Sequence, residues 1–231
     1  MKLTHFTLVL LNSILFGYSK VLDDCVCGQD AYYRPPNIKS ERIVNGTEVG
    51  PHRYPWMAFL SHPWSGICGG SIITDKTILS AGHCVYAIFD PLRTRWIVGV
   101  HSIEKALNDE ELSYGNDHIY FHPLYHRTML FDIYDMSIFI LETKIPFGPK
   151  ISPICQPHAD DDKLYWNRKA IVAGWGRIEE KGPLSDILME TQVVLKSDEE
   201  CRNMTDLNAY TYDAMICAHE IYRDSCQVCC F

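Results

Sequence analysis

The chain has 231 residues, of which 47% are hydrophobic and 22% charged, so it is long enough to bury a substantial hydrophobic core. Its formal net charge of -8 argues against a nucleic-acid-binding protein, because no basic face could dominate the electrostatic field. The ten cysteines favour an oxidising compartment over a reducing one.

The first 19 residues have the pattern of a secretory signal. A positive charge at Lys2 precedes an apolar run over residues 8–16 and small residues up to Ser19, after which we expect cleavage. The run is shorter than the roughly 20 residues that span a bilayer, so we predict a secreted, extracellular protein with no membrane partner. Two glycosylation sequons, at Asn45 and Asn203, fit that route.

Residues 20–42 form a short polar lead segment. The pair Pro35-Pro36 favours an extended backbone, which is typical of a linker or propeptide. The segment ends at Arg42, and the apolar Ile43 follows. An exposed arginine before an apolar residue is a cleavable bond, and processing there would create a new ammonium terminus at Ile43.

Short apolar segments that alternate with turns follow from Pro55 onward. They are rich in β-branched and aromatic residues and are separated by Gly, Pro, Asp and Asn, which predicts strands in an antiparallel barrel or sandwich. The one short helix that we predict spans 197–203, where Ser197 can cap a first turn of acidic residues. The predicted strands are 56–60, 70–73, 77–80, 95–100, 136–141, 170–173, 189–195 and 214–217.

One stretch carries a candidate for catalysis. The apolar strand 77–80 runs into Ala81 and Gly82, and His83 and Cys84 follow. An imidazole can take and give a proton at neutral pH, so His83 is a candidate general base at the rim of a β-scaffold. The alternative is a structural histidine, which is the commoner role for a single His.

The acidic run Asp160-Asp161-Asp162 has the residue type of a metal site, but no partner ligand sits at a fixed spacing from it. We interpret it as a solvated loop. The sequence predicts no metal and no cofactor.

A series of motifs follows one another along the chain: Arg42-Ile43-Val44-Asn45-Gly46, Tyr54-Pro55-Trp56-Met57-Ala58, Cys68-Gly69-Gly70-Ser71-Ile72-Ile73, Leu79-Ser80-Ala81-Gly82-His83-Cys84, Asp135-Met136-Ser137-Ile138-Phe139-Ile140-Leu141, Ile171-Val172-Ala173-Gly174-Trp175-Gly176, Met215-Ile216-Cys217-Ala218 and Asp224-Ser225-Cys226-Gln227. Taken together, these motifs resemble the chymotrypsin-like (trypsin-type) serine proteases, in order and spacing from Ile43 to Gln227. The resemblance implies the hydrolysis of peptide bonds and an all-β fold of two six-stranded antiparallel β-barrels, of which we expect the second to be incomplete in this chain.

This resemblance gives His83 the role of general base and then general acid, and Asp135 the role of the carboxylate that fixes its tautomer. Asp132 is the rival acid. We favour Asp135 because an apolar strand begins directly after it, whereas Asp132 is followed by two residues and then the second acid and has the context of a loop.

The same resemblance identifies Asp224 as the acid at the base of the primary specificity pocket. A carboxylate there selects protein or peptide substrates with Arg or Lys, and the alternative is a solvated acid in a loop. The resemblance also implies a zymogen that an activating protease cleaves at Arg42. Protease inhibitors are further expected partners.

Three disulfides are implied by matching to the family: Cys68 with Cys84, Cys201 with Cys217, and Cys155 with either Cys25 or Cys27. We favour Cys27 because the family commonly has Cys-Gly at that position. Each bridge typically stabilises a domain by about 2–4 kcal/mol.

The last residues depart from the family pattern. After Gln227 the family continues Gly-Asp-Ser-Gly-Gly-Pro, whereas this chain has Val228, Cys229 and Cys230 at the positions of the oxyanion glycine, the aspartate for the new terminus, and the serine. We therefore expect residues 43–231 to be a C-terminally truncated peptidase domain without serine-protease activity. Either the chain is a truncated product, for example of intron read-through, or it is a pseudo-protease that binds without cutting.

A thiol at Cys230 is not expected to replace the serine, because one residue from the end of this sequence it would not be held at a strained turn beside oxyanion donors. The sequence does not assign partners to Cys25, Cys226, Cys229 and Cys230.

Overall fold

The structure, a computed structural model, describes residues 27–28, 47–61, 68–86, 93–107, 112–128, 132–157, 165–177, 182–204 and 214–219. Several predicted features lie outside these residues. They are the signal segment, Cys25, the activation bond between Arg42 and Ile43, Asn45, the acidic run 160–162, Asp224, Cys226 and the residues from Val228 onward.

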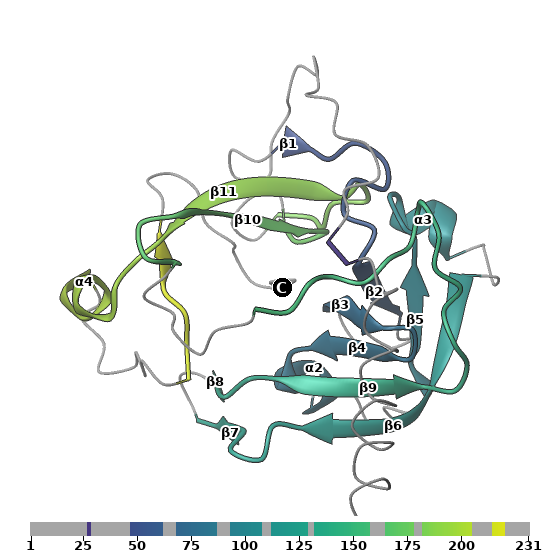
Figure 1. The fold of residues 1–231 in the computed structure, drawn as a ribbon, viewed down its shortest axis with the longest axis horizontal. Coiled ribbons are helices and arrows are strands. Elements are labelled where there is room, and N and C mark those ends of the chain that lie inside the picture. Colours follow the sequence, from purple (N-terminus) through teal and green to yellow (C-terminus); the bar gives the residue numbers. More distant parts are fainter. Residues whose placement is uncertain are drawn as a thin grey trace, which may run out of the picture.

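Six antiparallel strands close into a barrel in the N-terminal half of the chain (Figure 1). The barrel closes on itself because β5 pairs with both β6 and β2. In hydrogen-bonded order the strands are β2 (Met57–Ser61), β3 (Cys68–Thr74), β4 (Thr77–Ser80), β9 (Ser137–Leu141), β6 (Ser113–Phe121) and β5 (Arg95–Val98).

The barrel interior is packed with side chains from alternate strand positions. Trp96 and Phe139, both fully buried, meet edge to face with ring centroids 4.9 Å apart. Gly70 leaves room for this packing, since a Cβ there would lie 2.8 Å from Trp96 and 2.8 Å from the carbonyl oxygen of Leu79. The barrel is therefore a solid support for the residues at its rim.

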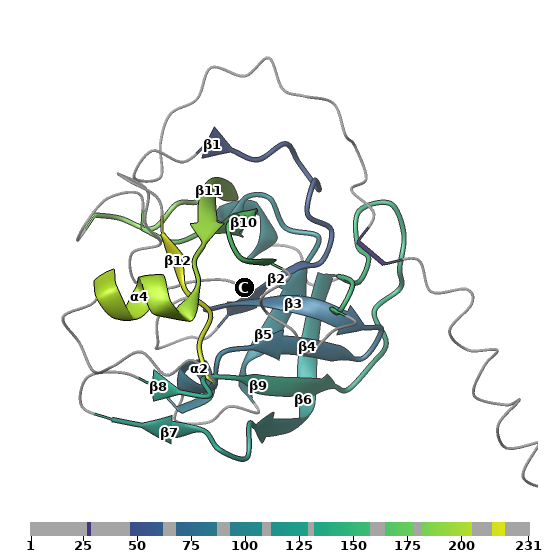
Figure 2. The same cartoon turned by 60° about the vertical axis from the view of Figure 1, so that its left-hand side comes forward.

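A second, four-stranded sheet among the described residues combines one short strand that precedes the barrel with three strands of the C-terminal half, and it lies beside the barrel in both ribbon views (Figures 1 and 2). Trp175, directly after β10, is fully buried and packs edge to face against Phe59 of β2, at 5.9 Å between ring centroids. Apolar packing thus joins the two halves. The strands are β1 (Thr47–Glu48), β11 (Met189–Leu195), β10 (Lys169–Gly174) and β12 (Ala218–His219).

The remaining elements are short. The described helices are α2 (Gly82–Tyr86), α3 (Ile103–Ala106) and α4 (Asp198–Met204), and the two-residue strands β7 (His126–Arg127) and β8 (Asp132–Ile133) pair with each other. At α4, the Glu200 amide donates to Ser197 Oγ and the Ser197 amide donates to Glu200 Oε2, at 3.3 and 3.0 Å. This capping box confirms the one helix that the sequence predicts.

The all-β fold predicted from the sequence is confirmed, with one closed barrel and a four-stranded sheet among the described residues. Several elements were not predicted: β6, the nine-residue strand that closes the barrel, the short helices α2 and α3, and the two-residue strands β1, β7 and β8. The strand predicted at 214–217 is wrong, because the residues that pair with β11 are Ala218 and His219.

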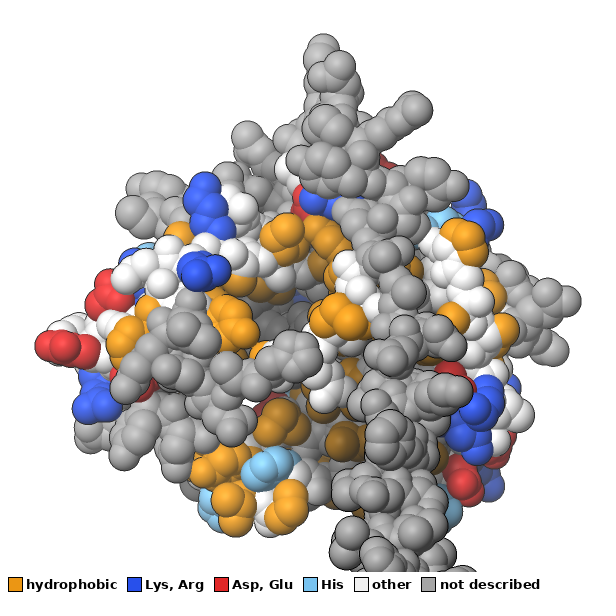
Figure 3. Space-filling view, viewed as in Figure 1, with side chains coloured by type: hydrophobic (Ala, Val, Ile, Leu, Met, Phe, Trp, Pro, Cys, Tyr) orange, Lys and Arg blue, Asp and Glu red, His pale blue; other side chains and the backbone are white. Residues whose placement is uncertain are grey.

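No charge of one sign dominates the coloured part of the face shown in Figure 3. On the face shown in Figure 3, hydrophobic side chains gather around a central hollow, and the coloured Lys, Arg, Asp and Glu side chains are scattered toward the edges. Among the described residues, no helix is long and apolar enough to cross a membrane.

Candidate active site

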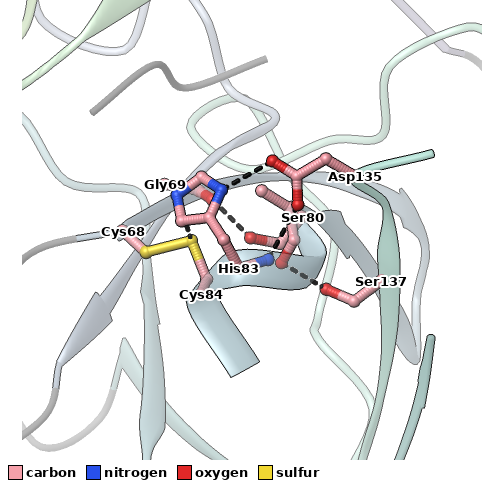
Figure 4. The surroundings of a disulfide bond; sticks show 8 residues. Cys68, Gly69, Ser80, His83, Cys84, Asp135 and Ser137 are labelled. Atoms are coloured by element: carbon pink, nitrogen blue, oxygen red, sulfur yellow. Dashed lines mark hydrogen bonds and ion pairs between the residues drawn. A yellow bond between two sulfur atoms is a disulfide. The ribbon is translucent and has the colours of Figure 1, made fainter. Parts of the chain in front are cut away.

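His83 lies at the rim of the barrel, in the first turn of α2, directly after β4 (Figure 4). Two buried serines fix the backbone that leads to it. Ser80 donates from Oγ to the carbonyl oxygen of Gly69 at 2.8 Å, and Ser137 of β9 donates to that of Ala81 at 2.7 Å. The supporting role of the two serines is not predicted from the sequence, although both belong to the matched motifs.

Asp135 precedes β9 and holds His83 at two points. Its Oδ2 is 2.6 Å from the ring nitrogen Nδ1, and its Oδ1 accepts a hydrogen bond from the His83 amide at 2.7 Å. The two contacts from one carboxylate fix both the ring and the backbone. With Nδ1 engaged, the imidazole turns Nε2 away from Asp135, and Nε2 lies 3.6 Å from the disulfide sulfur of Cys84.

This contact shifts the pKa of both groups. The hydrogen bond to Asp135 raises the pKa of His83 above its ordinary value of 6.5, outweighing the effect of burial. For Asp135, burial alone would raise the pKa. The hydrogen bonds from the His83 ring and amide outweigh it and bring the pKa below 3.8. The pair therefore favours an imidazolium beside a carboxylate.

Asp132 lies next to this pair. An oxygen of Asp132, an oxygen of Asp135 and a ring nitrogen of His83 all lie within 4.8 Å of one another. The loop expected at Asp132 is wrong, because the residue begins the two-residue strand β8 opposite Arg127 of β7. The Tyr125 hydroxyl donates to Asp132 Oδ1 at 3.2 Å.

This cluster has the spacing of a hydrogen-bonded system, not of ligands around one ion. Two ligands of a tetrahedral zinc at about 2.0–2.1 Å lie roughly 3.3 Å apart. The 2.6 Å between His83 Nδ1 and Asp135 Oδ2 is much shorter. The sulfurs of Cys68 and Cys84 also lie near His83, but they are joined in a disulfide.

The described residues form three disulfides, in the pairs that the resemblance implies. Their positions differ in relation to the site. Cys68–Cys84 fastens α2 to β3 beside His83, Cys201–Cys217 lies at α4, and Cys27–Cys155 ties the lead segment to the domain. Asn203 is exposed on α4, so its side chain is accessible.

A small apolar pocket beside α4 is separate from His83. None of the site residues lines it, so we do not assign it to the same chemistry. Its lining residues are Tyr165, Trp166, Leu195, Lys196, Asp198, Ile216 and Cys217.

A histidine bonded through Nδ1 to a partly buried carboxylate, on a rigid β-barrel, has the arrangement that activates a nucleophile in acyl-transfer hydrolases. Comparison with known proteins agrees with this class. The family model described as Trypsin matches residues 43–228, and the chain belongs to this family.

Several curated proteases are similar to the chain. Coagulation factor IX of Cavia porcellus is 29% identical over 195 residues, which cover 83% of this chain and 66% of that protein. Serine proteinase stubble of Drosophila melanogaster is 32% identical over 216 residues, covering 87% and 26%. Chymotrypsin-C of Mus musculus is 29% identical over 198 residues, covering 83% and 70%. The chain thus spans just under two thirds of the factor IX length and about a quarter of the stubble length.

Among solved structures, mouse neuropsin, described as a serine protease expressed in the limbic system of the brain, superposes with a TM-score of 0.64. The match covers 76% of this chain and 74% of neuropsin, at 23% identity. At this identity the likeness establishes the fold alone, and the fold is that of a serine protease.

Proposed function

We propose that the chain derives from a secreted trypsin-type serine endopeptidase in which His83 is the general base and Asp135 the acid that orients it. The observation that carries this proposal is the double contact of Asp135 with the His83 ring and amide, at 2.6 and 2.7 Å. A carboxylate on Nδ1 holds the proton there and leaves Nε2 to accept a proton from a nucleophile. The imidazolium that then forms is stabilised by the same carboxylate.

The substrate class follows from the family motif around Asp224. We propose protein or peptide substrates that are cut after Arg or Lys, because a pocket carboxylate pairs with a cationic side chain. Residues 1–19 would be the signal, residues 20–42 a lead segment, and residues 43–231 the peptidase domain, activated by cleavage after Arg42. The secreted character of the relatives, which include a coagulation factor, supports an extracellular location.

We further propose that the chain as printed does not turn over substrates by the serine route. In the register of the matched motif, Val228, Cys229 and Cys230 occupy the positions of the oxyanion glycine, the activation aspartate and the serine. The Trypsin match ends at residue 228, before both cysteines. Without the serine hydroxyl, His83 has no group from which to take the proton, and no acyl-enzyme forms.

The test is an activity assay on the secreted chain after cleavage at Arg42. We expect no hydrolysis of an arginine amide substrate and no labelling by a fluorophosphonate. A matched graft replaces the residues after Gln227 with the Gly-Asp-Ser-Gly-Gly-Pro motif and following segment of a trypsin-family enzyme. We expect that graft to cleave the substrate and its His83→Ala variant to lose the activity. Turnover by the ungrafted chain that a serine-directed inhibitor abolishes would refute the inactivity. Equal turnover by the graft and its His83→Ala variant would refute the role of His83.

A second candidate function is that of a non-catalytic binding or decoy protein. It is favoured by the combination of a complete His83–Asp135 pair with a cysteine at the serine position. Titration of the inactive chain with protein inhibitors of trypsin-family enzymes tests this candidate. Saturable binding in the micromolar range or tighter supports it, and its absence counts against it.

A further inference from the structure

We propose that Asp132 is a second carboxylate partner of His83, a positioning residue that presents negative charge to the imidazolium independently of Asp135. This inference goes beyond the proposed function, since it concerns the protonated ring and not the cutting of a peptide bond. It does not depend on whether the chain turns over a substrate.

The first support is the distance between the groups. Oxygens of Asp132 and Asp135 and a ring nitrogen of His83 all lie within 4.8 Å of one another. The Asp132 side chain is only 20% exposed and the Asp135 side chain only 22%. Charges this close and this sheltered interact with less screening by solvent than exposed pairs do. Asp132 is therefore placed to act on the ring through space.

The second support is that Asp132 is held in place. Tyr125 donates its hydroxyl hydrogen to Asp132 Oδ1, and Arg127 Nε lies 3.8 Å from the same oxygen. Burial, followed by the charge of Asp132, raises the pKa of Tyr125 to about 12, so the hydroxyl stays protonated and remains a donor. The pairing of β7 with β8 sets Arg127 opposite Asp132. The Tyr125 hydroxyl and the pairing of β7 with β8 thus hold the Asp132 carboxylate in place.

Tyr125 also links Asp132 to the backbone that carries His83. A Cβ on Gly82 would lie 2.9 Å from the Tyr125 ring and 3.3 Å from Asp135 Oδ1. The glycine therefore allows the Tyr125 ring and the Asp135 carboxylate to approach the backbone beside His83. The Tyr125 ring in turn stacks on Phe121 with centroids 5.4 Å apart. This packing holds the Tyr125 hydroxyl against Asp132, beside the backbone that carries His83.

The charges that face His83 act in opposite directions. Asp135 and Asp132 favour the protonated ring, whereas burial and the Arg127 cation disfavour it. The two acids raise the pKa of His83, and the neighbouring arginine lowers it. Asp132 and Arg127 are therefore expected to tune the same proton with opposite sign, which a purely structural role would not produce.

The experiment measures the titration of His83 by NMR of the imidazole signals in the secreted full-length chain, assigned with a His83→Gln variant. We expect Asp132→Asn to lower the His83 pKa and Arg127→Gln to raise it. Asp75→Asn is the matched control. It removes the same charge from a carboxylate that pairs with Lys144 at the β3–β4 turn, and we expect no change in His83.

The Asp132→Asn change is repeated in an Asp135→Asn background. If Asp132 acts on the ring directly, its substitution lowers the His83 pKa in both backgrounds. An effect that disappears without Asp135 would show that Asp132 acts only through Asp135, and would overturn the proposal. If Asp132→Asn does not fold, the Arg127→Gln variant tests the inference instead, because the Arg127 side chain is exposed. An unchanged His83 pKa in that variant refutes the inference. The arginine amide assay is scored separately, so failure of the proposed function leaves this result standing.

Discussion

Removal of the Cys68–Cys84 disulfide tests how the fold supports the site, and the chain supplies its own control. Cys68–Cys84 and Cys201–Cys217 each join residues separated by 16 positions. Loop-closure entropy depends on that separation, and for a loop of this length it gives about 3 kcal/mol of stabilisation for either bridge. The buried partners are also similar, since Cys84 is 3% and Cys201 1% exposed.

The double variants Cys68→Ala/Cys84→Ala and Cys201→Ala/Cys217→Ala should therefore each lower the free energy of unfolding by about 3 kcal/mol. Their effect on the site should differ. Cys84 is adjacent to His83 in α2, whereas the second bridge lies at α4. Only the first variant should loosen the contact between His83 and Asp135 and bring the pKa of His83 back toward 6.5.

Urea denaturation followed by tryptophan fluorescence gives the stability, and imidazole NMR gives the titration of His83. A loss well below 1 kcal/mol in both variants would refute the loop-entropy argument. A lower His83 pKa in the Cys201→Ala/Cys217→Ala variant would refute the local role assigned to the Cys68–Cys84 bridge.

Two further predictions follow from the pKa directions and the packing. The raised pKa of His83 stabilises the fold below pH 6.5, and this stabilisation is lost as the pH rises through the folded-state pKa of His83. The lowered pKa of Asp135 stabilises the fold above pH 3.8, and this stabilisation is lost as the pH falls through the folded-state pKa of Asp135. Asp135→Asn should therefore reduce stability most between pH 3.8 and 6.5. Unfolding measured as a function of pH tests this, and a loss of equal size at every pH would contradict it. Gly70→Ala should lower the free energy of unfolding by more than about 1 kcal/mol, because its Cβ would meet the Leu79 carbonyl at 2.8 Å. Gly50→Ala is the control: its Cβ would have no atom within 4 Å, so its stability should stay within about 0.5 kcal/mol of the parent. Equal midpoints of the two glycine variants in thermal unfolding would contradict the packing argument.

The sequence predicts most of the longer strands from their β-branched and aromatic residues, but it does not predict β6, which has a polar centre. β6 reads Ser-Tyr-Gly-Asn-Asp-His-Ile-Tyr-Phe, with glycine and three polar residues in its middle. Its Asn116 is buried because the amide donates to the carbonyl and hydroxyl oxygens of Thr94, at 2.9 and 2.8 Å. The register shifts between Asn116 and His118. Tertiary hydrogen bonds and a bulge override the propensity of this segment, and neither is visible in a local pattern.

The site shows the same division between local and tertiary information. Motif matching singles out His83 and Asp135, and the structure brings them together. The local sequence context excludes Asp132 as the orienting acid. In the structure, however, an oxygen of Asp132 lies within 4.8 Å of a ring nitrogen of His83 and an oxygen of Asp135. Tyr125, which holds Asp132, carries no motif of its own. Its position follows from the pairing of two-residue strands that the sequence does not reveal.

Among the described residues, the contacts that fix the His83–Asp135 pair lie on the barrel and at its rim. The histidine follows β4 and the aspartate precedes β9, and these strands pair directly from Thr77–Ile140 to Ser80–Ser137. The two serines that brace the approach to His83 also lie on these strands. This barrel closes without residues from Val228 onward, so we expect the proton-binding pair to form whichever residue stands at the serine position. An imidazole with two nearby carboxylates then remains as a group that binds a proton reversibly, whether or not a nucleophile is present.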